Sequence, residues 1–420
     1  MESGPQKTHP ELPPPLHLRA PPQTAIDQSS PLPTATTTPS CMLRASVLSI
    51  LKMAAESAPK KLCTTIGTHN GHFHADEALA VYILRKHVAA YKDAKLVRTR
   101  DPALLKPCSI VVDVGGEFKP KELRFDHHQS DFEETFSKHH KTKLSSAGLV
   151  YKEFGREILA ATLHTNKEDE LVGLVYNKFY EGFIEALDAH DNGIAAYDNP
   201  GERKFSEDSF TLGAMVGRRN PRSSKMPSDP VEAQAVEDKH FEIASQRIGE
   251  EFDYELEYYT SVWPQAGGIV ESAYNERKQY DPDGRIIVFK GHSAAWKDHL
   301  FTLEAEQQGG PDVQKENGEE QKGKEQKGVL YVLYPESAAP GSKWRIQCVP
   351  DSKGSFNSRK KLPAAWKGLR DEELDDVAGI EGCVFVHPGR FMGGNKTFEG
   401  ALAMAKKALE TPLEKTALEN

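Results

Sequence analysis

Lys61–Ala90, with the sequence KLCTTIGTHNGHFHADEALAVYILRKHVAA, is the first stretch of the chain that has the pattern of folded protein. Leu62–Ile66 is a short apolar run with β-branched residues, which predicts a strand. Asp76–Ala90 has the apolar spacing of a helix. A histidine-rich loop joins the two. A strand that runs through a polar loop into a helix is typical of α/β proteins, whose ligands gather at the carboxyl ends of the strands.

The same alternation continues through the first half of the chain. Strand patterns and helical patterns follow one another at 109–114, 123–125, 147–159, 171–187 and 231–260. Strands that alternate with helices predict an α/β fold with a mostly parallel sheet and helices on both faces. We therefore expect a first domain over 61–260.

A second, smaller α/β domain is predicted over 265–415, with a role in substrate binding. Strand patterns at 285–289, 329–334, 344–349 and 383–386 precede a closing helical pattern at 397–409. Residues 306–328 consist almost wholly of Gln, Glu, Lys and Gly, and such a composition predicts a disordered, solvated insert between two strands.

The segment that precedes the first domain has a different composition. Residues 1–60 are dense in Pro, Ser and Thr and hold too few large apolar side chains to bury a core. Within them, 42–53 is short and amphipathic and lacks acids, as a mitochondrial presequence does. A chance helical stretch in a disordered tail explains 42–53 equally well, and in that case we expect the protein in the cytoplasm.

Bulk properties exclude several classes of protein. The formal net charge of the 420 residues is −9, so the chain as a whole is not built to coat nucleic acid. Its five cysteines are scattered without a CxxC pair, which indicates neither a disulfide framework nor a zinc finger. No apolar run is long enough for a membrane span, so we expect no membrane partner.

Four clusters of His and Asp end successive predicted elements: 68–77, 111–115, 124–128 and 185–193. Asp113 follows a Val-Val strand, where burial of a carboxylate is costly unless it is paired or bound to metal. Imidazole and carboxylate together suit Mn²⁺, Fe²⁺ or Zn²⁺. Two such ions can activate a water and hold a phosphoryl oxygen. The clusters therefore predict a metal-dependent phosphoesterase.

Asp126-His127-His128 and the clusters around it resemble the DHH phosphoesterase superfamily. Within it, THNGHFHADE at 68–77, together with Asp188 and Asn192-Gly193, is similar to the melanocyte-proliferating-gene family. The resemblance implies a 3′→5′ exoribonuclease of mitochondria and nucleus that acts on single-stranded RNA by a two-metal mechanism. The alternative is a small-molecule phosphoesterase that acts on pyrophosphate, nucleotides or short oligonucleotides. The oligomeric state stays open.

The resemblance also implies roles for individual residues. Six of them would hold two divalent ions: His69, His74, Asp76, Asp113, His127 and Asp188. Asp113 would bridge the ions, His128 would face the scissile phosphate, and Asp126 would orient a histidine ring. The superfamily commonly has Asp where this chain has His74. Mn²⁺ is the expected metal, with Mg²⁺ or a softer ion as the alternative.

The neighbours of these residues have simpler explanations. His72 is a ligand, a substrate contact or a packing group. Glu77 opens the predicted helix, where the helix dipole alone favours an acid. Asp191 is better explained as a cap of the turn at Asn192-Gly193 than as a metal ligand.

The second domain has a glycine-rich segment, Val386–Thr397, between a predicted strand and the last helix, and the resemblance implies that it binds substrate. Its glycines would let backbone N–H groups approach an anion. The predicted substrate-binding residues are Arg390, Gly393, Gly394 and Asn395. A plain strand–turn–helix connection is the alternative. Basic runs at 218–225 and 359–370 are further candidates for RNA contacts, although most charge runs are simply solvated.

Overall fold

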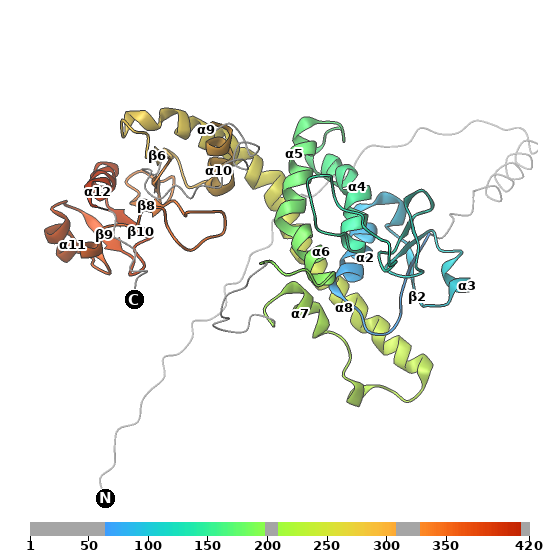
Figure 1. The fold of residues 1–420 in the computed structure, drawn as a ribbon. Coiled ribbons are helices and arrows are strands. Elements are labelled where there is room, and N and C mark those ends of the chain that lie inside the picture. The colour runs from blue at the N-terminus through green and yellow to red at the C-terminus, as the bar shows by residue number, and fades with distance from the viewer. Residues whose placement is uncertain (1–63, 198–208, 308–327, 413–420) are drawn as a thin grey trace, which may run out of the picture. The chain divides into compact units, whose positions relative to one another are not determined.

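The computed structural model describes residues 64–197, 209–307 and 328–412, which contain two five-stranded sheets (Figure 1). The predictions for 1–60, for the presequence at 42–53 and for nearly all of the 306–328 insert lie outside these residues. The domain boundaries and the subcellular location stay predictions. None of the helices in the described ranges is long and apolar enough to cross a membrane.

The first sheet has the strand order β2-β1-β3-β5-β4. Its strands are β1 (Thr65–Thr68), β2 (Lys95–Arg98), β3 (Ile110–Val112), β4 (Phe118–Lys119) and β5 (Arg124–Phe125). All neighbours are parallel except β4, which runs antiparallel to β5. Strand β2 lies on one side of β1 and β3 lies on the other, so the direction in which strands are added reverses at β1. In open α/β sheets, ligands bind where the strand order reverses in this way.

Helices cover both faces of the first sheet, as the sequence predicts. Against it pack α2 (Ala75–His87), α3 (Pro102–Leu105) and α4 (Ser146–Leu163). Ile110 and Val112 of β3 belong to the main core with α2 and α4. Val111, between them, lies in a small cluster with Leu105 of α3 on the opposite face. Side chains alternate across a strand, so the continuous apolar run of β3 serves both faces.

The remaining helices of this part of the chain are α5 (Glu170–Phe179), α6 (Glu185–Asp191), α7 (Leu212–Gly217), α8 (Pro230–Glu257) and α9 (Trp263–Glu276). The prediction of one continuous helix over 171–187 is wrong in one respect. A wider, π-helical turn at Tyr180–Ile184 separates α5 from α6, and α6 extends to Asp191. Such turns shift every later side chain around the helix axis. Another π-helical turn, Tyr258–Val262, separates α8 from α9.

The second sheet has the order β6-β7-β8-β10-β9 and is mostly antiparallel, with only β6 and β7 parallel. Its strands are β6 (Ile286–Val288), β7 (Tyr331–Pro335), β8 (Trp344–Cys348), β9 (Cys383–Val386) and β10 (Met392–Asn395). Cores on its two faces join it to α9 and α10 (Trp296–Gln307), and to α11 (Asp371–Ala378) and α12 (Phe398–Glu410). The sheet and its four helices have the α/β character predicted for the second half of the chain.

The alternative of a plain strand–turn–helix connection over Val386–Thr397 is wrong, because β10 lies inside this segment between β8 and β9. A Cβ on Gly393 would stand 3.1 Å from the carbonyl oxygen of Phe385, and one on Gly394 would stand 2.8 Å from that of Trp344. The glycines therefore let a central strand fit closely between its neighbours. Composition alone suggested a turn, since glycine usually weakens a strand.

Gly249 marks the closest approach of α8 to α2. A Cβ there would lie 2.1–2.3 Å from ring atoms of Tyr82. We expect Gly249→Ala to lower the free energy of unfolding by about 1–3 kcal/mol, because overpacking outweighs the gain in helix propensity. Gly268→Ala in α9 meets nothing within 4 Å and should raise the melting temperature. Thermal unfolding followed by circular dichroism compares the two, and an equal gain at both positions would contradict the tight contact.

Candidate metal site

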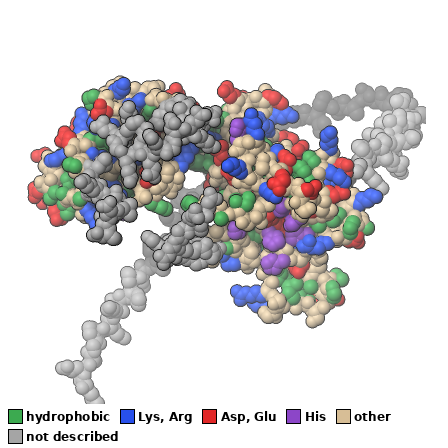
Figure 2. Space-filling model, in the orientation of Figure 1, with side chains coloured by type: hydrophobic (Ala, Val, Ile, Leu, Met, Phe, Trp, Pro, Cys, Tyr) green, Lys and Arg blue, Asp and Glu red, His purple; other side chains and the backbone are tan. Residues whose placement is uncertain are grey.

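The predicted clusters meet at one edge of the first sheet. His69 follows β1, Asp113 follows β3, and Asp126 with His127 and His128 follows β5. Because β1, β3 and β5 are adjacent and parallel, their carboxyl ends bring these side chains together. Figure 2 shows histidine side chains gathered on the surface beside acidic and basic ones.

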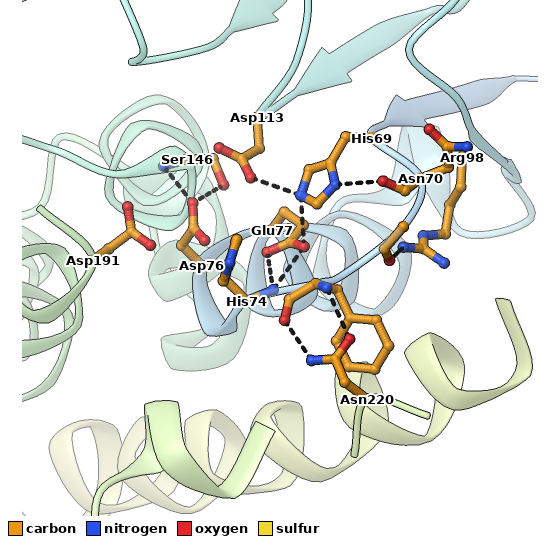
Figure 3. A network of polar contacts seen from close by, with 12 residues as sticks. His69, Asn70, His74, Asp76, Glu77, Arg98, Asp113, Ser146, Asp191 and Asn220 are labelled. Carbon is orange, nitrogen blue, oxygen red and sulfur yellow. Dashed lines mark hydrogen bonds and ion pairs between the residues drawn. The ribbon is translucent and has the colours of Figure 1, made fainter. Parts of the chain in front are cut away.

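Helix α2 adds two buried acids from its first turn, Asp76 and Glu77, which are 1% and 0% exposed. Glu77 accepts a hydrogen bond from the backbone N–H of His74 at 2.9 Å and so caps the helix. Its other role is visible in Figure 3: its carboxylate lies 3.0 Å from Nε2 of His69. Helix-start preference explained Glu77 in the sequence, but this contact makes it part of the site.

In the described part of the chain, three groups have ligand atoms within 4.8 Å of one another. They are His69, His74, Glu77 and Asp113; Asp113, Asp126, His127 and His128; and Asp76, His127 and Asp191. Asp113 belongs to two groups, as a bridging carboxylate would. It also has a left-handed φ of 59°, a conformation that is uncommon outside glycine and typical of functional positions.

Most of the predicted ligands are therefore brought together, but Asp188 is not in any of these groups. Its buried carboxylate accepts hydrogen bonds from the Ser145 N–H at 3.0 Å, the Ser145 hydroxyl at 2.6 Å and the Tyr180 hydroxyl at 3.1 Å. Asp191 lies instead 3.0 Å from Nε2 of His127. His72 is exposed and belongs to none of the groups. The individual ligand roles stay predictions.

The charges of the site are crowded. Burial and the charge of Asp76 raise the pKa of Asp113 to about 7. Burial alone would lower the pKa of His69, but its contacts with Asp113 and Glu77 outweigh this and raise the pKa to about 10. Three buried atoms, Asp76 Oδ1, Asp113 Oδ1 and His127 Nδ1, have no hydrogen-bond partner among the described residues. A divalent cation fits this donor set, because it would satisfy both the charge and the unpaired atoms.

Metal binding should therefore release protons. Burial works against charge on His127, yet Asp191 and Asp76 raise its pKa to about 9. Because the pKa of His69 is about 10 and that of His127 about 9, each ring carries a second proton at neutral pH, and a cation must displace that proton to bind. We expect metal affinity to rise with pH and to level off near these pKa values. Calorimetry in buffers of different ionisation enthalpy counts the protons, and a pH-independent affinity without proton release would contradict the assignment.

His128 is held at the rim of the site by Asp126. The Asp126 carboxylate accepts hydrogen bonds from the Gly116 N–H at 2.6 Å and from Nδ1 of His128 at 2.8 Å. This hydrogen bond raises the pKa of His128, which favours the doubly protonated ring. The His128 side chain is 64% exposed and stacks on His127 at 4.4 Å between ring centroids. Its Nε2 makes no hydrogen bond within the described residues, so this nitrogen can meet a substrate.

The histidine loop between β1 and α2 is fastened by residues far along the chain (Figure 3). The Phe73 N–H donates to Oδ1 of Asn220 at 3.0 Å, and Nδ2 of Asn220 donates to the Phe73 carbonyl oxygen at 2.8 Å. The Gly71 N–H donates to Glu237 at 3.1 Å, and Nη2 of Arg98 donates to the Gly71 carbonyl oxygen at 2.8 Å. These positioning residues escaped sequence analysis, since no local motif marks them.

The four residues predicted to bind substrate lie around β10. Gly393 and Gly394 are strand residues in close contact with their neighbours. Asn395 is fully buried, donates to the Glu381 carbonyl oxygen at 2.9 Å and accepts from the Thr397 N–H at 3.0 Å. Its side chain therefore serves the start of α12. Arg390 has a left-handed φ of 62°. Substrate binding by this set stays a prediction.

Comparison with known proteins covers both sheets. Residues 65–409 match the sequence model labelled MYG1 exonuclease, described as "Uncharacterised protein family (UPF0160)". The chain belongs to the MYG1 exonuclease family. The human MYG1 exonuclease is 45% identical over 349 residues, which cover 82% of this chain and 85% of the human protein. The Caenorhabditis elegans MYG1 protein is 40% identical over 368 residues, which cover 86% of this chain and 100% of that protein.

Membership in the MYG1 family confirms the resemblance to the melanocyte-proliferating-gene family. The Dictyostelium discoideum MYG1 protein is a further relative, 41% identical over 356 residues, which cover 84% of this chain and 99% of that protein. The three ligand groups lie within the matched residues. Placement of the MYG1 family in the DHH superfamily stays a prediction.

Asp188 and Asp191 can be told apart in this MYG1 family member. Asp188→Ala would leave buried donors on Ser145 and Tyr180 unpaired, at about 1–3 kcal/mol each, so we expect a clear fall in melting temperature. Asp191 is 19% exposed, and Asp191→Ala should instead lower bound metal with little change in melting temperature. Metal analysis and thermal unfolding on the same preparations test this. Loss of metal from a stable Asp188→Ala protein would support the ligand set implied by the resemblance.

Proposed function

We propose that this MYG1 family member is a metal-dependent exonuclease that hydrolyses single-stranded RNA from the 3′ end. The observation that carries the proposal is the overlap of three ligand groups at the carboxyl edge of the first sheet, with Asp113 shared between two of them. The name of the human relative, an exonuclease, supports the reaction class. RNA as substrate, the 3′→5′ direction and Mn²⁺ rest on the family resemblance.

The chain's own residues are arranged for phosphodiester hydrolysis. Nε2 of His69 lies 3.0 Å from the Glu77 carboxylate and 3.3 Å from that of Asp113, so this nitrogen faces the other candidate ligands and would bind the metal. Asp113, which belongs to two of the ligand groups, would help to hold both ions. When bound, the ions would supply Lewis-acid stabilisation of a phosphoryl oxygen and lower the pKa of a water.

Asp126 and His128 serve the substrate side of this site. Asp126 holds Nδ1 of His128, which leaves Nε2 of the same ring free to face the substrate. Nε2 would donate a hydrogen bond to a phosphate oxygen as negative charge develops on that oxygen. The pair needs no metal contact for this role. The alternative substrate, a small phosphoester such as pyrophosphate, would use the same groups.

The test uses the full chain, stripped of metal by a chelator and reloaded with Mn²⁺, Mg²⁺ or Zn²⁺ in turn. Single-stranded RNA labelled at its 5′ end should give a ladder of shortening products, while RNA labelled at its 3′ end should release labelled mononucleotide at once. DNA of the same sequence and pyrophosphate are the comparison substrates. Hydrolysis of pyrophosphate without hydrolysis of RNA would show the small-molecule alternative, and full activity in chelator would exclude metal dependence.

A further inference from the structure

A basic segment lies next to the histidine loop. From Ser209 to Ser228 the chain contains four basic residues and no Asp or Glu, although the whole chain carries a net charge of −9. Arg219, Arg222 and Lys225 are exposed and form no salt bridge with any described residue. A stretch with four basic residues and no acid is a local positive surface on a chain of negative net charge.

Hydrogen bonds fix this segment against the candidate metal site. Asn220 makes the two hydrogen bonds to the backbone of Phe73, and Phe73 stands between His72 and His74 in the histidine loop. The Arg219 N–H donates to the Val216 carbonyl oxygen at 2.8 Å, and Nδ1 of His240 donates to the Arg219 carbonyl oxygen at 2.6 Å. The backbone is therefore held, while the charged ends of Arg219 and Arg222 remain in solvent.

An exposed aromatic ring stands at the start of the same segment. Phe210 is 94% exposed, so its ring is open to a stacking partner. Arg218 donates from Nη1 to the Ser209 carbonyl oxygen at 2.7 Å, which ties the residue next to Phe210 to the basic segment. Basic side chains beside an exposed aromatic ring are the combination that binds single-stranded nucleic acid, through phosphates and stacked bases respectively.

We propose that Phe210, Arg219, Arg222 and Lys225 form a binding track for single-stranded nucleic acid that leads to the histidine loop. The arginines and the lysine contact backbone phosphates, and Phe210 stacks on a base. The inference rests on the proposed function, because the track would bind the part of the substrate strand that lies beyond the hydrolysed bond. Asn220 is a positioning residue: its hydrogen bonds to Phe73 hold the track next to the histidine loop.

The charged part of the track is tested by binding without catalysis. Fluorescence anisotropy of a short labelled single-stranded RNA is measured in chelator over a range of salt concentrations. Each phosphate contact contributes about 0.7 to the slope of log K against log salt, so Arg219→Ala/Arg222→Ala should flatten it by about 1.4 and weaken binding at least about tenfold. The control is Lys92→Ala/Lys95→Ala: both lysines are exposed at the amino end of β2, the opposite edge of the sheet from the site.

The aromatic part has a different signature in the same assay. Loss of one stacked base should weaken binding roughly five- to a hundredfold with no change in salt slope, because stacking releases no counterions. We expect this of Phe210→Ala. The matched control is Phe356→Ala, since Phe356 is 102% exposed and belongs to the second half of the chain. Melting temperatures of all variants should equal that of the natural chain, because every substituted side chain is exposed.

The outcomes separate the track from the proposed function. If the natural chain binds RNA and the track variants bind it equally well, the track is wrong while the nuclease proposal stands. If the natural chain binds no RNA at any salt concentration, the track is wrong, and the hydrolysis assay with reloaded metal decides the nuclease proposal by itself. If track variants bind weakly but Asp113 proves dispensable for hydrolysis, the track stands and the proposed catalytic site fails.

Discussion

Replacing Asp113 by asparagine will lower hydrolysis by at least about 10³-fold and remove most of the bound metal. Asp113 is 4% exposed and is the one carboxylate that contributes to two of the ligand groups in the described residues. An amide at this position keeps the size of the side chain and tolerates the left-handed backbone, but it cannot bridge two cations by charge. The effect should therefore be on chemistry and metal, with the fold preserved.

Elemental analysis after dialysis and RNA hydrolysis on the same preparation measure the two effects of Asp113→Asn. Asp376→Asn, an exposed acid of α11, is the control and should behave as the natural chain does. Near-normal turnover in a folded Asp113→Asn protein would show that catalysis takes place elsewhere.

The second large effect is expected from His128→Ala, with hydrolysis lowered about 10²–10³-fold and metal content almost unchanged. His128 is mostly exposed and anchored by Asp126, so it is placed to contact substrate, while His69 is buried and the His127 side chain is 7% exposed, and both contact Asp113. His139→Ala, in an exposed stretch, is the control. Metal loss equal to the loss of turnover would make His128 a ligand instead.

The strand ends that carry His69, Asp113 and His127 could be predicted from the sequence, because an apolar run followed by polar residues marks where a parallel strand meets the ligand edge. Strand β2, Lys95–Arg98, was missed because two of its four residues are charged. Strand β10 was missed because its glycines suggested a turn. Both strands are specified by their neighbours and not by their own composition.

The contribution of Asp191 could not be foreseen for a similar reason. Asp188 and Asp191 are three residues apart, so both lie on one side of α6 and only the exact rotation of the helix decides which one meets His127. The π-helical turn at Tyr180–Ile184 sets that rotation, and its sequence has no recognisable signature. Asn220 and Glu237 were invisible because they contact the histidine loop across 147 and 166 residues of sequence.

The fastening of the histidine loop also determines when the site can form during synthesis. All the candidate ligand residues, His69 to Asp191, precede Asn220, Gln234 and Glu237 along the chain and so emerge from the ribosome before them. Until Asn220 and the first part of α8 have emerged, the Asn70 side chain and the backbone N–H groups of Gly71 and Phe73 lack these hydrogen-bond partners. A nascent chain or a fragment that stops short of Glu237 would therefore carry every candidate ligand and still lack contacts that preorganise the site, so we expect it to bind metal more weakly than the full chain.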